Sequence, residues 1–281
     1  MASEHAHGLA GDAVVEKAAR ANALDRYLAA RLAPKGVRRD LIALAAFLGE
    51  VSRVVGTVSE PMIGEMRLQW WRDALDPGRT GGSTGSPIAE ALRDTITRHA
   101  LPEELFSTIL EAHSRALDPQ FSASGPALDR YLDATEGAAF RLAAIILDSG
   151  KSAAAGDLLF AAGQAYGRVH LLRTLPLSLA AGRSSPLSSP LSGPAHAPVA
   201  PDWGAIARPM LDAAKSQLDE ARLRAPAAPA TILPAILPLA LVEPYLAALE
   251  RLGPSFARER ADISPLTRVW RLWWASARGR I

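Results

Sequence analysis

Apolar residues recur at helical spacing along almost the whole chain, and the alternation of apolar and polar residues that marks a β-strand is nearly absent. Proline, glycine and serine interrupt this pattern at intervals, and each interruption predicts the end of a helix. The pattern predicts helices over residues 12–33, 37–57, 60–76, 86–99, 102–117, 126–148, 153–180, 203–224, 231–252 and 264–279. We therefore expect an all-α protein.

Residues 184–201 are rich in proline and serine and cannot continue a helix. Such a segment can bind a partner or separate domains, but the helices on both sides have the pattern of one bundle. We therefore expect a surface loop within a single domain that spans residues 1–281. A chain of 281 residues, 49% of them hydrophobic, is sufficient to build the core of such a domain.

Composition excludes several kinds of function. The chain has no cysteine, which excludes disulfides, zinc–thiolate sites and thiol nucleophiles. The formal net charge is +2, and only the C-terminus approaches the clustered arginines that nucleic-acid binding needs, so we expect no nucleic acid partner. There is no leader pattern and no run of about 18 uncharged apolar residues. We expect a cytoplasmic protein, with peripheral attachment to the inner membrane face as an alternative.

One block carries a specific motif: Ser59-Glu60-Pro61, followed by Arg67-Leu68-Gln69-Trp70-Trp71-Arg72. This block resembles a signature of the squalene/phytoene synthase family, and the similarity extends over most of the chain. The resemblance implies an isoprenoid-synthase-like helical bundle around a central cavity. In that family two Asp-rich helices hold Mg²⁺ against the diphosphate of a prenyl substrate.

The segment 44–56 resembles the helix that carries the first Asp-rich motif. Carboxylates three or four residues apart share a helix face and can bind Mg²⁺ together. The corresponding positions here are Ser52, Arg53 and Gly56, and none of them is a carboxylate. Glu50 and Glu60 are nearby but too far apart in the chain to chelate one ion.

The segment 165–183 resembles the helix that carries the second motif. Its positions read Thr174, Leu177, Ser178, Ala181 and Gly182, again without a carboxylate. Because both motifs are lost while the apolar frame persists, we expect no catalytic residue, no metal and no cofactor. Magnesium would be needed only if the protein were an active prenyltransferase.

Several residues are candidates to line the cavity: Glu50, Arg53, Arg67, Tyr131, Gly137 and Arg173. Arg53 and Arg173 would make the cavity mouth positive, which favours an anionic headgroup or an acidic partner segment. Gly137 would either leave room for an apolar tail or allow two helices to pack closely. Trp70 and Trp71 are expected in the core, and His170 is expected to be a hydrogen-bonded structural histidine.

The C-terminal stretch combines tryptophans and arginines. Trp270, Trp273 and Trp274 share one helix face by their spacing. The arginines expected on another face are Arg268, Arg271 and Arg278. Such a helix suits an anionic membrane surface, and it equally suits a last helix docked on the bundle. Both alternatives remain open.

The combination of the Trp70–Trp71 pair with the absence of both aspartate motifs resembles a divergent branch of the family that includes a mitochondrial respiratory complex I assembly factor. This resemblance implies a lipid-binding or protein-binding factor. Its partners would be a prenyl or anionic lipid, a membrane surface or a respiratory-complex subunit. The alternative is an active phytoene or squalene synthase-type prenyltransferase that condenses two prenyl diphosphates. That activity would require Arg53, Arg67 and Arg173 to bind diphosphate in place of magnesium.

Overall fold

The computed structural model describes residues 2–58, 60–76, 78, 84–118, 121, 123–149, 155–180 and 202–281. Every regular element in these ranges is helical, which confirms the predicted all-α class. The α-helices are α1 (Ala2–Asn22), α2 (Leu24–Leu32), α3 (Lys35–Thr57), α4 (Pro61–Leu75), α5 (Pro87–His99), α6 (Glu103–Arg115), α7 (Pro126–Leu132), α8 (Ala138–Asp148), α9 (Gly156–Ala180), α10 (Trp203–Arg224), α11 (Leu233–Ile236), α12 (Val242–Leu252) and α13 (Pro265–Arg278).

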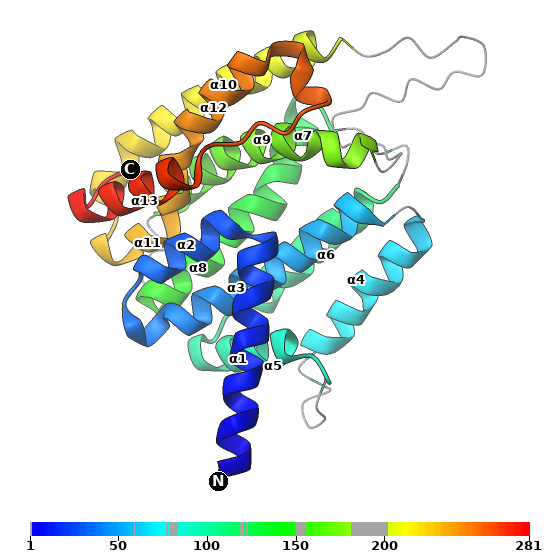
Figure 1. Cartoon of the computed structure of the whole chain (residues 1–281), viewed down its shortest axis with the longest axis vertical. Coiled ribbons are helices and arrows are strands. Elements are labelled where there is room, and N and C mark those ends of the chain that lie inside the picture. The colour runs from blue at the N-terminus through cyan, green and yellow to red at the C-terminus, as the bar shows by residue number, and fades with distance from the viewer. Residues whose placement is uncertain are drawn as a thin grey trace.

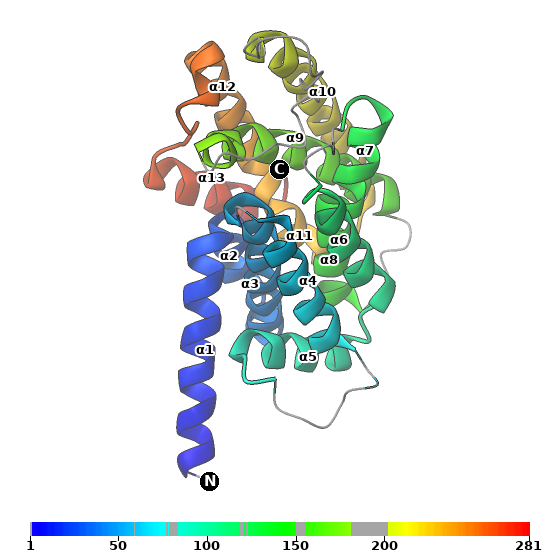
Figure 2. The same cartoon turned by 90° about the vertical axis from the view of Figure 1, so that its right-hand side faces the viewer.

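The long helix α9 is the centre of the bundle. It lies between α10 and α12 on one side and α3 and α8 on the other (Figure 1). Helix α1 packs against α3 and α5, and its N-terminal end projects beyond the other helices (Figure 2). The last helix, α13, packs against α2. The side chains of Phe47, Phe140 and Tyr245 are fully buried, so the core extends through α3, α8 and α12.

The helices with clear N-terminal caps begin close to where the sequence places them. The side chains of Ser86, Asp202 and Ser264 accept a hydrogen bond from a backbone N–H in the first turn of α5, α10 and α13. Each satisfies an N–H that has no partner within the helix, which stabilises that starting point. Helix α10 has the same bounds as the predicted 203–224.

Three predicted helices are divided instead. The range 12–33 breaks at Ala23, where α3 passes so closely that a Cβ on Gly49 would lie 2.7 Å from the Cβ of Asn22. The range 126–148 contains a π-helical turn, η2 (Asp133–Gly137), between α7 and α8.

The range 231–252 divides into η5 (Ala230–Ile232), α11, η6 (Leu237–Leu241) and α12. Pro234 lies in the first turn of α11, and Pro238 lies in the 3-10 turn η6, where its missing N–H ends the regular helix.

One apolar segment differs from the expectation that no run could span a membrane. Ala230–Ala257 has the length of a spanning segment and contains an 18-residue window with a mean hydropathy of 1.9, but 72% of that window is buried inside the bundle. Core segments commonly pass this test, and the short helical pieces of this one pack against α2, α8 and α13. We therefore assign it to the core. The predicted loop at 184–201 lies outside the described residues, and the single domain remains a prediction.

Candidate functional site

A cavity of about 430 Å³ lies between α3, the α7–η2 segment and α9. Both helices expected to carry Asp-rich motifs contribute to its wall. The motif positions that line it are Ser52, Arg53 and Gly56 from α3 and Thr174, Leu177 and Ser178 from α9. Residues of the two segments that resemble the Asp-rich helices therefore meet at one cavity. Ala181 and Gly182 lie outside the described residues.

The residues at these positions do not fit Mg²⁺. The ion needs several oxygen ligands and usually binds through at least one carboxylate. Ser52, Thr174 and Ser178 offer only neutral hydroxyls, and Arg53 is a cation. Within the described ranges, no group of three or more His, Asp or Glu side chains could hold a metal ion.

The cavity adjoins a smaller recess of about 40 Å³, whose wall includes Arg26, His113, Glu136, Tyr166 and His170. His113, Glu136 and His170 also line the cavity, so the two spaces share one polar wall. Arg26 Nη2 donates a hydrogen bond to Glu136 Oε2. The Arg26 guanidinium carbon also lies 5.4 Å from the ring centroid of Tyr166. The ring of His170 stacks on Tyr166 with the centroids 5.9 Å apart.

Burial sets the charge of these groups. Burial alone would raise the pKa of Glu136, but Arg26 and the neighbouring histidines lower it below its ordinary value, so the group is a carboxylate at neutral pH. Burial lowers the pKa of His113 and His170, and both side chains are therefore neutral at neutral pH. His113 Nδ1 lies 2.8 Å from the backbone oxygen of Ile109. Because a carbonyl only accepts, Nδ1 carries the proton and Nε2 is left as an acceptor.

Glu50 and Arg67 line a different space from the cavity. With Arg53, Trp70 and Trp71 they border a groove of about 250 Å³ beside α3 and α4. Glu50 Oε1 accepts a hydrogen bond of 2.9 Å from Asn22, the last residue of α1. Of these candidates only Arg53 lines both spaces. Placing Glu50 and Arg67 in the cavity was wrong, because both border the groove and neither is among the residues that line the cavity.

The Trp70–Trp71 pair is divided between core and surface. Trp71 is buried, and its ring centroid lies 5.0 Å from that of Phe47, whereas Trp70 is 41% exposed. Adjacent residues point about 100° apart around a helix, so only one of the two can face the core. The expectation of a core position was correct for Trp71 and wrong for Trp70.

Tyr131 lines the cavity, as the resemblance implied, and its side chain is buried. Gly137 has a different role. A Cβ on Gly163 of α9 would lie only 2.6 Å from the backbone nitrogen of Gly137. The two glycines thus allow η2 and α9 to touch, which decides between the two alternatives for Gly137 in favour of close helix packing.

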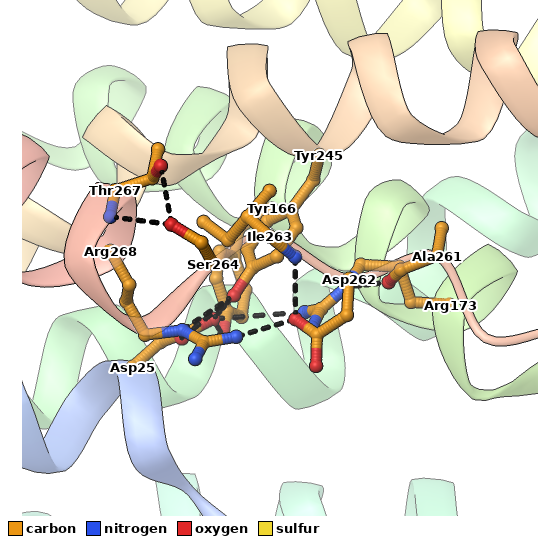
Figure 3. A network of polar contacts seen from close by, with 10 residues as sticks. All are labelled: Asp25, Tyr166, Arg173, Tyr245, Ala261, Asp262, Ile263, Ser264, Thr267 and Arg268. Carbon is orange, nitrogen blue, oxygen red and sulfur yellow. Dashed lines mark hydrogen bonds and ion pairs between the residues drawn. The ribbon is translucent and has the colours of Figure 1, made fainter.

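Arg173 points into a buried ionic cluster rather than to the cavity mouth (Figure 3). This Asp25 cluster consists of Asp25, Arg173, Tyr245, Asp262 and Arg268. Asp25 accepts a hydrogen bond of 2.9 Å from the Tyr245 hydroxyl, lies 3.0 Å from Arg268 Nε and lies 3.7 Å from Arg173 Nη1. Arg173 also donates to the backbone oxygen of Ala261 and to Asp262, at 3.0 and 3.2 Å.

Two site predictions are wrong for this reason. Arg173 cannot make the cavity mouth positive, and Arg268 cannot contact a membrane, because both are buried and paired with Asp25 and Asp262. Two arginines and two aspartates balance in charge, which makes their burial tolerable. Asp25 and Arg173 are far apart in the sequence, so no local sequence pattern predicts that they pair.

Helix α13 docks on the bundle through one face and leaves its tryptophans outside. Leu272, Ala275 and Arg268 are buried on the docking side. The exposed side, which we call the tryptophan face, consists of Leu266, Val269, Trp270, Trp273 and Trp274. The three indoles lie against one another, with the Trp270 and Trp274 centroids 5.5 Å apart.

Of the two other arginines predicted there, Arg271 lies 3.4 Å from Glu243. Arg278 covers the ring of Trp274 at 4.1 Å. Docking is therefore shown, and the tryptophan face is still available for a further contact.

Comparison with known proteins gives the family. The model of the squalene/phytoene synthase family matches residues 19–267. The chain belongs to this family. A solved structure of squalene synthase HpnC from Alicyclobacillus acidocaldarius superposes with a TM-score of 0.65 at 19% identity, covering 88% of this chain and 96% of that one. This likeness confirms the isoprenoid-synthase type of helical bundle.

The sequence relatives divide between two kinds of protein. The mouse protein named NADH dehydrogenase (ubiquinone) complex I, assembly factor 6, is 30% identical over 152 residues, which are 54% of this chain and 45% of that protein. The bifunctional protein CrtB/UppS of Streptomyces coelicolor is 33% identical over 174 residues, 60% of this chain and 30% of that protein. The chain thus matches about half or less of the length of these curated relatives.

Proposed function

We propose that this member of the squalene/phytoene synthase family is a non-catalytic binding factor that serves the assembly of respiratory complex I. The observation that carries the proposal is the cavity wall. The positions where the family holds Mg²⁺ present Ser52, Arg53, Gly56, Thr174 and Ser178, which cannot replace anionic ligands. The similarity to complex I assembly factor 6 supports the assembly role.

The competing function is head-to-head prenyl transfer, and the similarity to CrtB/UppS is in its favour. Without a metal site it would need Arg53, Arg67 and Arg173 to bind the diphosphates together. Arg67 borders the groove and Arg173 belongs to the Asp25 cluster, so the three do not converge on the cavity. The arrangement therefore favours the binding factor.

Two measurements test this proposal together. Deleting the gene is expected to lower the amount of assembled complex I, and the intact gene is expected to restore it. The purified protein is expected to make no squalene-type or phytoene-type product from farnesyl or geranylgeranyl diphosphate with Mg²⁺, while a working squalene synthase run alongside does. A normal complex I level would contradict the assembly role, and a prenyl product would contradict the loss of catalysis.

The tryptophan face supports a location for this factor at the surface of an anionic membrane. Indoles are enriched at headgroup depth, where their apolar rings leave water and their N–H groups stay hydrated. Residues 263–281 contain Arg268, Arg271, Arg278 and Arg280 but no Asp or Glu, and only Arg268 is buried. The charge therefore complements anionic headgroups. We propose a cytoplasmic protein that attaches peripherally to the inner membrane face through α13.

Replacing Trp273 with alanine is expected to weaken binding to phosphatidylglycerol-containing vesicles about fivefold, because burial of one indole is lost. Sedimentation with vesicles measures this affinity. Trp70→Ala is the matched control, since Trp70 is exposed to 41% and Trp273 to 47% but Trp70 lies on α4. Equal losses in both variants, or no vesicle binding by the unaltered protein, would exclude α13 as the membrane contact.

A further inference from the structure

The recess beside the cavity presents hydrogen-bond acceptors to a small enclosed space. Arg26 donates a hydrogen bond to Glu136 Oε2, and Glu136 lines the recess with a second carboxylate oxygen, Oε1, that can accept another. His113 Nε2 is a second acceptor, since Nδ1 donates to the backbone oxygen of Ile109. His113 lines both the recess and the cavity and is itself buried. A bound group that carries a donor can therefore pair with Glu136 or His113, while Arg26 and Ser52 on the same wall carry donors.

The same wall disfavours charged groups. A phosphate in the recess would lie beside the Glu136 carboxylate, and an ammonium would lie beside the Arg26 guanidinium. Either ion would also lose its hydration in a space of about 40 Å³, and burying an unpaired ion is far more costly than burying a hydrogen-bonded neutral group. An uncharged hydroxyl supplies one donor and two acceptors and fits this space.

The larger part of the site is suited to an apolar chain. The cavity of about 430 Å³ is within the size range of small-molecule sites. Beyond the recess its wall includes Val55, Leu132 and Leu171. A ligand with a small polar end and an apolar body would place each part against matching side chains.

We propose that the cavity binds an uncharged long-chain alcohol, with the hydroxyl in the recess against Glu136 and His113 and the chain along Val55, Leu132 and Leu171. This inference rests on the proposed function, in which the cavity binds a lipid without a metal. It adds the chemical class of that lipid.

Farnesol and its methyl ether are the probes, because the ether keeps the chain and loses the donor. Calorimetry on the full chain is expected to show farnesol binding about tenfold tighter than the ether. His113→Asn keeps a donor for the Ile109 oxygen and removes the acceptor at Nε2. It is expected to weaken farnesol about fivefold and to leave the ether unchanged. His113→Gln places an amide oxygen near the lost nitrogen and is expected to retain most of the farnesol affinity.

A control variant separates this site from the cavity mouth. Arg260 also lines the cavity, at a distance in sequence from the recess residues. Arg260→Gln is expected to change the farnesol affinity less than twofold, whereas an anionic headgroup bound at that arginine would lose affinity. Thermal unfolding of each variant checks that it is folded. If His113→Asn does not fold, the alcohol–ether comparison on the unaltered protein decides.

Equal affinities for farnesol and the ether in the unaltered protein would overturn the proposal. Tighter binding of farnesyl diphosphate that falls in Arg260→Gln would also overturn it, in favour of an anionic ligand. These outcomes differ from a failure of the proposed function. If farnesol does not bind while gene deletion still lowers complex I, only the ligand class is wrong. A prenyl product in the turnover assay would instead reject the binding factor itself.

Discussion

Replacing Asp25 with alanine is expected to lower the free energy of unfolding by about 3–5 kcal/mol, the typical cost of removing one partner from a buried ion pair. Asp25 is buried and faces two buried arginines, Arg173 and Arg268, together with the hydroxyls of Tyr166 and Tyr245. Its removal would leave the guanidinium groups with only Asp262, which is half-exposed. Denaturant unfolding measured by circular dichroism gives the change.

An exposed ion pair provides the comparison for this prediction. Lys215 and Glu250 form a salt bridge at the surface, with each side chain about half exposed. Glu250→Ala is expected to leave the unfolding midpoint almost unchanged, since exposed pairs are screened by water and salt. If the Asp25 and Glu250 variants had similar midpoints, the Asp25 cluster would not be a main support of the fold.

Adding a methyl group at Gly163 is expected to lower stability by about 3 kcal/mol, at the upper end of the range for overpacked cores. A Cβ there would lie 2.6 Å from the nitrogen and 2.7 Å from the Cα of Gly137. Both are backbone atoms, so α9 and η2 would have to move apart instead of one side chain turning away. The thermal unfolding midpoint of Gly163→Ala measures the loss.

The matched control is the same substitution where space is free. A Cβ on Gly56 would meet no atom within 4 Å. Because alanine favours the helix over glycine by up to about 1 kcal/mol, Gly56→Ala is expected to be neutral or stabilising. A Gly163→Ala protein as stable as the Gly56 variant would show that the η2–α9 crossing is looser than described.

The sequence was sufficient for the fold wherever local chemistry decides it. The helix at 203–224 was found with its bounds because Asp202 caps its first turn and the apolar period continues through it. The apolar spacing predicts one helix over 231–252, although the range contains Pro234 and Pro238 and the structure divides it. Those prolines were the visible signal for the 3-10 turns. The break at Ala23 had no such signal, since it depends on the closeness of α3.

The candidate site, like the fold, could be predicted from the sequence only where local sequence determines it. Ser52 and Ser178, from the two segments that resemble the family's motif helices, lie at one cavity, because the helical spacing of both segments could be read from the sequence. The partner of Arg173 could not be foreseen, since Asp25 lies on a different helix far away in sequence. The recess was missed as well. The sequence offered one signal for the recess. Glu136 is the single acidic residue in the largely apolar stretch 134–147, and a carboxylate buried in such a stretch needs a partner.

Asp25 and Arg26 are neighbours on α2, yet they belong to different networks. Asp25 holds α13 through Arg268, while Arg26 holds Glu136 at the recess, and Tyr166 contacts both residues. One short helix thus connects the inner end of the cavity to the helix that carries the tryptophan face. By thermodynamic reciprocity, a ligand that favours one position of α2 changes the docking equilibrium of α13 by the same factor by which that docking changes the ligand's affinity. The recess and the docking face of α13 therefore share α2 as one support, and a displacement of this helix at either network would reach the other through adjacent residues.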